Sequence, residues 1–70
     1  MPLDLAIEVA REEDGRWIAE VAALPGTLCY GQTRGDAVAH VQALALRVLA
    51  DRLEHDEAPK EALTITFHAA

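Results

Sequence analysis

The chain has 70 residues, of which 51% are hydrophobic, and its 12 acidic against 6 basic side chains give a net charge of −6. This length holds one domain with a small core, and the single cysteine, Cys29, excludes an internal disulfide. The acidic balance disfavours nucleic acid and anionic membranes as direct partners, and it either suits a basic protein partner or serves solubility alone.

The first two expected strands form a hairpin. Apolar side chains alternate with polar or small ones over residues 3–10, which is the period of a strand with one buried face. Asp14-Gly15 is a hairpin-turn signal, because both residue types tolerate a positive φ. The alternation resumes over residues 16–22 and places three apolar side chains on one face: Trp17, Ala19 and Val21.

A short third strand is expected over residues 28–32. Leu24-Pro25-Gly26 ends the strand before it, since proline cannot donate to a ladder and glycine permits a tight reversal. Thr33 is a good helix N-cap, and Asp36 favours the positive end of the helix. We therefore expect a helix to begin at residue 34.

This helix is expected to run to about residue 55 and to be ended by Ala58-Pro59, with a last strand over residues 63–68. Its main apolar stripe consists of Ala37, Val41, Leu44, Ala45 and Val48, flanked by Val38 and Leu49. Four further apolar residues lie away from that stripe and would be exposed in a monomer: Ala39, Leu46, Ala50 and Leu53. We therefore expect a homo-oligomer, a dimer or tetramer, with these four residues at its interface.

The element order β-β-β-α-β predicts an α+β domain spanning residues 1–70. One helix would pack on one face of a four-stranded mixed sheet, and the other face would stay uncovered.

The residues do not assemble a nuclease site. Two-metal nucleases need several carboxylates around the metal ions. Asp4 or Glu8 could supply one, and the helix offers Asp36 and two residues near its far end, but the last strand has no carboxylate. We expect no enzyme activity, no metal and no cofactor.

Two other residues have chemical potential. Cys29 could be a nucleophile, but no histidine is close in sequence, so a small strand residue is the simpler interpretation. His68 could be a ligand or base, or an exposed histidine. No glycine-rich phosphate motif is present.

The densest charge is Glu12-Glu13-Asp14 at the expected hairpin tip. It is either a solvated turn or an electrostatic contact to a basic partner, with Trp17 and Tyr30 as nearby aromatic anchors.

The order of these features resembles the HicB family of antitoxins over about residues 7–57. The residues that carry the resemblance are Glu13-Asp14-Gly15, Trp17, Ala19, Leu24-Pro25-Gly26, Gly31 and Thr33. The resemblance implies a truncated ribonuclease H-like core with the last strand beside the first. It also implies a HicA-like partner, a small basic toxin that cuts messenger RNA and whose active site would be masked.

Typical family members add a C-terminal DNA-binding segment, which does not follow the last strand here, so no repressor role is expected. The alternative is an orphan oligomeric module that binds another protein or a small ligand. No run of roughly 18 apolar residues is present, and the first ten residues contain no basic one, so we expect no membrane span, no signal peptide and a cytoplasmic location.

Overall fold

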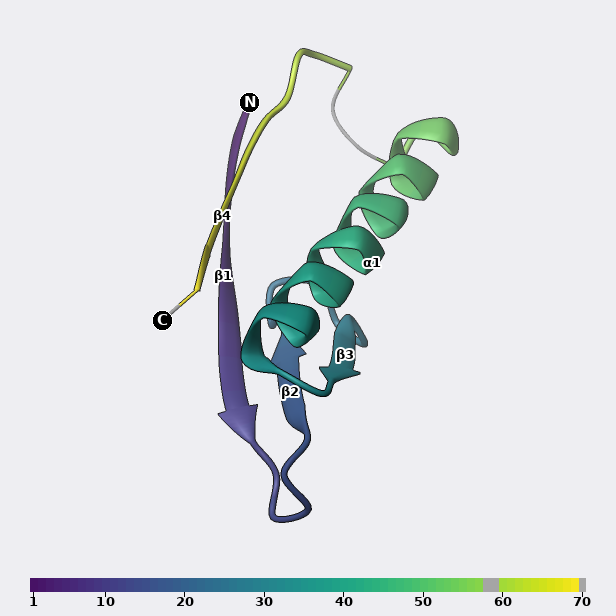
Figure 1. Cartoon of the computed structure of the whole chain (residues 1–70). Helices are drawn as coiled ribbons and strands as arrows, with labels where there is room; N and C mark the ends of the chain where they lie inside the picture. Colours follow the sequence, from purple (N-terminus) through teal and green to yellow (C-terminus); the bar gives the residue numbers. More distant parts are fainter. Residues whose placement is uncertain (58–59, 70) are drawn as a thin grey trace.

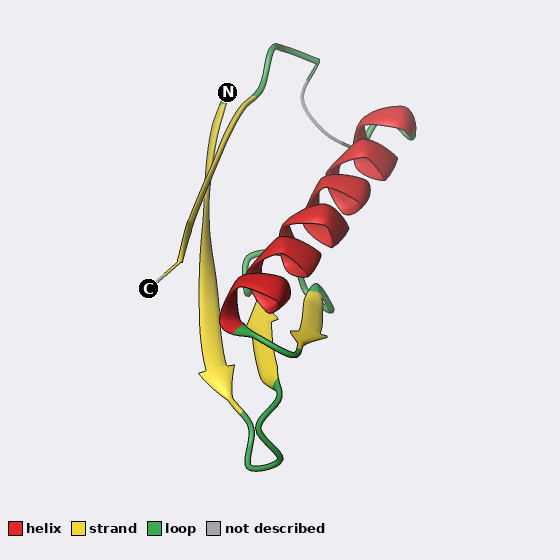
Figure 2. Ribbon diagram, viewed as in Figure 1, coloured by secondary structure: helices red, strands yellow, loops and turns green. Residues whose placement is uncertain are grey.

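The computed structural model describes residues 1–57 and 60–69 and contains four strands and one helix (Figure 1). The elements are β1 (Pro2–Arg11), β2 (Trp17–Glu20), β3 (Leu28–Gly31), α1 (Arg34–Glu54) and β4 (Thr64–Ala69). The sheet order is β3-β2-β1-β4, with β1 parallel to β4 and the other neighbours antiparallel. The single helix lies on one face of this mixed sheet (Figure 2), which confirms the predicted α+β class and places the last strand beside the first.

The β1–β2 hairpin turns through a loop of residues 13–15. The Glu12 N–H donates to the Arg16 carbonyl (2.7 Å), and the Gly15 N–H donates to the Glu12 carbonyl (3.0 Å). Gly15 has a φ of 90°, a left-handed conformation that glycine adopts without strain. This is a turn followed by a glycine bulge, so β2 begins at Trp17 and not at the predicted residue 16.

The chain between β2 and β3 makes two consecutive turns. β2 ends at Glu20, before the predicted residue 22, because the Leu24 N–H donates to the Val21 carbonyl (3.0 Å) and closes the first turn. Pro25 and Gly26 then occupy the centre of a second turn, in which Gly26 has a φ of 81°. This turn is closed by the Thr27 N–H, which donates to the Leu24 carbonyl (3.0 Å).

Both ends of α1 are capped. The Thr33 hydroxyl accepts a hydrogen bond from the Asp36 N–H (3.0 Å), as the sequence predicts for an N-cap. At the other end, Asp56 has a φ of 57°, and the Glu57 N–H donates to the Arg52 carbonyl (2.8 Å). This left-handed cap ends the helix at Glu54, whereas the predicted stop at Ala58-Pro59 lies outside the described residues.

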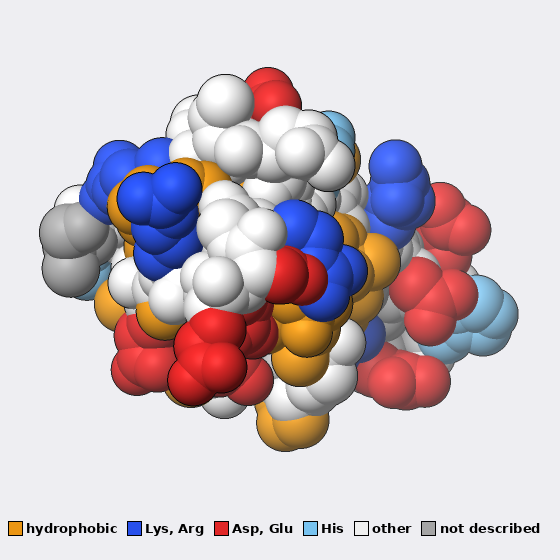
Figure 3. Space-filling view, turned by 60° about the horizontal axis from the view of Figure 1, so that its bottom comes forward, with side chains coloured by type: hydrophobic (Ala, Val, Ile, Leu, Met, Phe, Trp, Pro, Cys, Tyr) orange, Lys and Arg blue, Asp and Glu red, His pale blue; other side chains and the backbone are white. Residues whose placement is uncertain are grey.

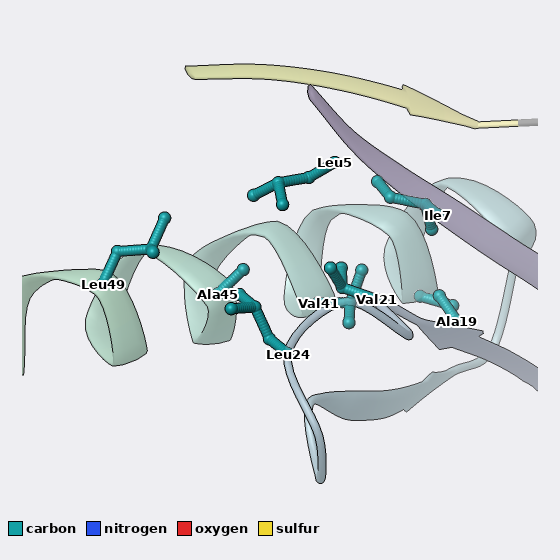
Figure 4. Packing of buried hydrophobic residues seen from close by; sticks show 9 residues of the cluster. Leu5, Ile7, Ala19, Val21, Leu24, Val41, Ala45 and Leu49 are labelled. Atoms are coloured by element: carbon teal, nitrogen blue, oxygen red, sulfur yellow. The ribbon is translucent and has the colours of Figure 1, made fainter. Parts of the chain in front are cut away.

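The core lies between α1 and the first three strands (Figure 4). The helix contributes residues at intervals of four: Ala37, Val41, Ala45 and Leu49. The predicted apolar stripe placed Leu44 at its centre and Leu49 at its flank. The structure corrects this, because Leu49 is buried and Leu44 is only half-buried. Residues at intervals of four lie on the same face of a helix, so this row faces the sheet.

The start of α1 lies very close to the sheet at Gly31, the last residue of β3. A Cβ atom at this position would lie 2.4 Å from the backbone nitrogen of Ala37. Only glycine permits the start of α1 to lie this close to the strand that precedes it. Gly31 therefore sets the height of the helix above the sheet.

We expect Gly31→Ala to lower the free energy of unfolding by about 3 kcal/mol, because either the helix or the strand must move to admit the methyl group. The matched variant is Gly35→Ala, where a Cβ atom would be 3.9 Å from its nearest neighbour. This second change should raise stability by roughly 0.5 kcal/mol through helix propensity. Urea unfolding followed by circular dichroism measures both; equal stability of Gly31→Ala and the parent chain would contradict the packing.

Candidate functional site

The sheet face opposite α1 has no second layer. Leu5, Ile7 and Ala19 point toward the helix and are buried, so alternate residues of each strand point away from it. Strand register places the following residues on this open face: Asp4, Ala6 and Glu8 of β1, Ile18 and Glu20 of β2, Leu28 and Tyr30 of β3, and Thr64, Thr66 and His68 of β4. It is a broad surface that combines apolar and acidic side chains.

The apolar part of the open face lies on β2 and β3. Ile18 is the cross-strand partner of Tyr30, and Glu20 is the partner of Leu28. Tyr30 is 42% exposed and Leu28 is 40% exposed, which is high for large apolar side chains in ordered strands. Tyrosine in particular is enriched among the residues that contribute most to binding at protein interfaces.

Arg16 holds the Tyr30 ring in place. Its guanidinium carbon lies 4.5 Å from the centre of the ring, in cation–π geometry. The Arg16 Nε atom also donates to the Asp14 carboxylate (2.7 Å), and the Arg16 N–H donates to the same group (3.0 Å). At the backbone, His40 Nδ1 donates to the Tyr30 carbonyl (2.9 Å), so a helix residue fixes β3 as well.

These contacts shift the protonation equilibria of Asp14 and Arg16 at the hairpin tip. The backbone hydrogen bond from Arg16, and then its side-chain hydrogen bond, hold the pKa of Asp14 below the ordinary value of 3.8. The same hydrogen bond raises the pKa of Arg16. Asp14 is therefore a paired ion, and Figure 3 shows acidic and basic side chains interspersed on the side of the molecule where the hairpin comes forward. Glu12 and Glu13 remain as the unpaired acids among the described tip residues.

The predicted partner-binding residues fall on both sides of the sheet. Arg16 links Tyr30 to the tip residue Asp14. Trp17, in contrast, is the partner of Gly31 and lies on the helix face, where it is half-buried against the core beneath Arg11. Tyr30 and Trp17 therefore cannot anchor the same flat contact, because successive strand positions face opposite sides.

The open face also contains an unfavourable pair. Glu8 of β1 lies directly opposite Glu20 of β2 in the antiparallel ladder. Like charges at opposed positions destabilise a sheet, and no described cation is within ion-pair distance of either carboxylate. The sequence patterns do not reveal this pair, because it is found only by counting residues back from the hairpin loop in its observed length.

The candidate nuclease residues lie in separate layers. Asp4 is on the open face opposite Thr66, whereas Asp36, Asp51 and Glu54 belong to the helix on the other side of the sheet. Within residues 1–57 and 60–69, no three His, Cys, Asp or Glu side chains gather closely enough to hold a metal ion. Cys29 is half-buried on the helix face opposite Ala19, and His68 is exposed on the open face.

A shallow apolar groove of about 240 Å³ opens between the first half of β1 and the last turns of α1. Leu3, Leu5, Leu24 and Leu49 form much of its wall, and Arg52 and Glu57 are the charged residues that line it. Pockets for small ligands usually measure about 300–1,000 Å³ and contain converging polar groups. The groove is therefore a weaker candidate site than the open face.

Comparison of the chain with protein-family models, with curated proteins and with solved structures found no match. In the part of the chain that the structure describes, no helix is long and apolar enough to cross a membrane.

Low pH should weaken the ion pair between Asp14 and Arg16 at the hairpin tip. Because the pKa of Asp14 is lower in the folded chain than its ordinary value of 3.8, the ion pair contributes stability above that pH. This contribution is lost as the pH falls through the folded pKa. An NMR titration of the Asp14 carboxyl carbon should give a midpoint below 3.8, and Arg16→Gln, which keeps the backbone hydrogen bond, should raise the midpoint part of the way back. An unchanged midpoint in Arg16→Gln would show that the guanidinium does not contact Asp14 in solution.

Removing one charge of the opposed pair should stabilise the free chain. We expect Glu20→Gln to raise the free energy of unfolding by about 0.5 kcal/mol at low ionic strength, and added salt should reduce this gain. Glu8→Gln should act similarly, and the double variant should gain less than the sum of the singles, since either one removes the repulsion. Glu13→Gln in the loop is the control for a simple change of net charge. A strictly additive double variant would argue against the register.

Proposed function

We propose that this chain is an antitoxin-like binding protein that neutralises a small basic ribonuclease of the HicA type. The observation that carries the proposal is the Glu8–Glu20 pair beside exposed apolar side chains on an uncovered sheet face. A lysine or arginine of a partner placed between these carboxylates would relieve their repulsion. The HicB-like sequence pattern supports the partner class, and the net charge of −6 supports a basic partner.

The open face offers the two components that a protein interface needs. Tyr30 and Leu28 provide exposed apolar area, and Arg16 holds the tyrosine ring before any partner arrives. A side chain that is already ordered loses less conformational entropy on binding. Tyr30 therefore serves as an anchor, and Glu8 with Glu20 selects a cationic group next to it.

The acidic hairpin tip has a different role in this proposal. Glu12 and Glu13 attract a basic protein from a distance, which mainly raises the association rate and is screened at physiological salt. Asp14 contributes less, because Arg16 already neutralises it. Trp17 acts through the stability of the sheet, since it packs against the core.

A single experiment distinguishes the toxin partner from another protein ligand. The HicA-type protein encoded beside the gene is purified, and its cleavage of labelled RNA is measured while the folded chain is titrated in. We expect stoichiometric inhibition. If the toxin stays active in a saturating excess of the folded chain, or if no such neighbour exists, the antitoxin proposal fails and an orphan binding module takes its place.

Charge-neutral variants test the site. Glu8→Gln with Glu20→Gln should weaken binding of this toxin about ten-fold or more and reduce the salt dependence, although the free variant is more stable. Glu54→Gln with Glu57→Gln removes the same charge outside the open face and should change the affinity little. Tyr30→Ala should raise the dissociation rate. Equal weakening by both double variants would show that net charge, and not the opposed pair, governs binding.

A further inference from the structure

The outer side of α1 has a regular apolar seam. Five exposed residues follow one another at intervals of four, three, four and three: Ala39, Ala43, Leu46, Ala50 and Leu53. Leu46 is 48% exposed and Leu53 is 43% exposed. The seam lies about 140° around the helix from the buried stripe, so the sheet does not cover it. This alternating spacing is the pattern by which two helices pack along their length.

The seam contains no charge, although the chain is strongly acidic. The six charged residues of α1 all lie outside it: Arg34, Asp36, Arg47, Asp51, Arg52 and Glu54. A second copy with a net charge of −6 would meet repulsion wherever carboxylates face each other. The five seam residues let two copies meet along an uncharged strip, and Asp36 and Glu54 lie about 60° from its centre. A basic partner, in contrast, would find no complementary charge there.

The seam also matches itself when it is reversed. In an antiparallel pair with a twofold axis at Leu46, this leucine meets its own copy. Ala39 meets Leu53 of the other copy, and Ala43 lies near the other Ala50. Small residues thus face large ones at both ends, and small residues on either side of the axis let the helices approach closely. A twofold interface requires this kind of self-complementary pattern.

We propose that a second copy of this chain packs on the seam, helix against antiparallel helix, with the twofold axis at Leu46. The assembly has its two helices in the middle and its two sheets outside, so both open faces stay accessible. The strip is only about 20 Å long and 10 Å wide, which is less than a standard interface provides. The dimer is therefore weak and forms in a concentration-dependent way. This inference does not depend on the identity of the partner proposed above.

Sedimentation equilibrium from low micromolar to submillimolar concentration tests the association. The parent chain should pass from 7.6 kDa to twice that mass. Leu46→Glu with Leu53→Glu should remain monomeric at every concentration while its circular dichroism spectrum is unchanged, since both side chains are already half-exposed. The matched control is Leu28→Glu, which alters an equally exposed leucine on the open face and should leave the dimer intact.

Cross-linking tests the axis. In a Cys29→Ala background, Leu46→Cys should form an intermolecular disulfide on mild oxidation, because the axis brings the two positions together. Leu28→Cys should not. A parent chain that stays monomeric at submillimolar concentration overturns the proposal. So does a dimer that survives the Leu46 and Leu53 changes, which would move the interface to the open face or to the edge strand β4.

Discussion

The close approach of α1 to the sheet at Gly31 and Ala37 is the contact on which the rest of the structure depends. The residues buried between the helix and the sheet include three alanines, Ala19, Ala37 and Ala45, which are all fully buried. They bring the helix axis near the strands, and the larger side chains Leu5, Ile7 and Leu24 then close the core from the side (Figure 4). A small core of this kind leaves little tolerance for added volume, because protein interiors are already close-packed. The helix height fixed here determines which residues of α1 are buried and which remain outside.

The sequence predicted the elements well because their signals are local. Alternation identified β1, Thr33 marked the start of the helix, and Leu24-Pro25-Gly26 marked the break after β2. The helix ends at Glu54, close to the predicted residue 55, but its cap was not predicted, because Asp56 takes the left-handed conformation for which glycine is the usual signal. The Glu8–Glu20 pair could not be predicted from Asp14-Gly15 alone. A two-residue loop would have shifted the register by one position, and such a shift turns every side chain of a strand to the other face.

The two outer surfaces of the molecule differ because they follow different periodicities. On the sheet, alternation by two brings Glu8, Glu20 and Tyr30 onto one open face, where acid and apolar groups are neighbours. On the helix, apolar residues recur every seven positions, which is about two turns. Leucine and alanine side chains therefore form a strip, and the charged side chains of α1 lie outside it. Trp17 and Tyr30 show that two residues on neighbouring strands can face opposite sides of the sheet. Both are aromatic residues close to the hairpin in the fold, yet the sheet lies between their side chains.

The position of β4 has a consequence for the order in which the chain folds. This strand lies at the edge of the sheet beside β1, away from the helix (Figure 1). Its Ile65 and Phe67 reach the core only in part. Its pairing joins Pro2 to Thr64, so a loop of almost the whole chain must close before the first hydrogen bond of the ladder forms. The hairpin and α1, in contrast, are built from contacts between neighbours in sequence. Loop closure of this length is slow, and β4 contacts chiefly β1 rather than the helix, so we expect β4 to dock after the other elements. Because β4 is an edge strand, we expect amide protons of its ladder to exchange through local opening and the central amide protons of α1 to exchange on global unfolding.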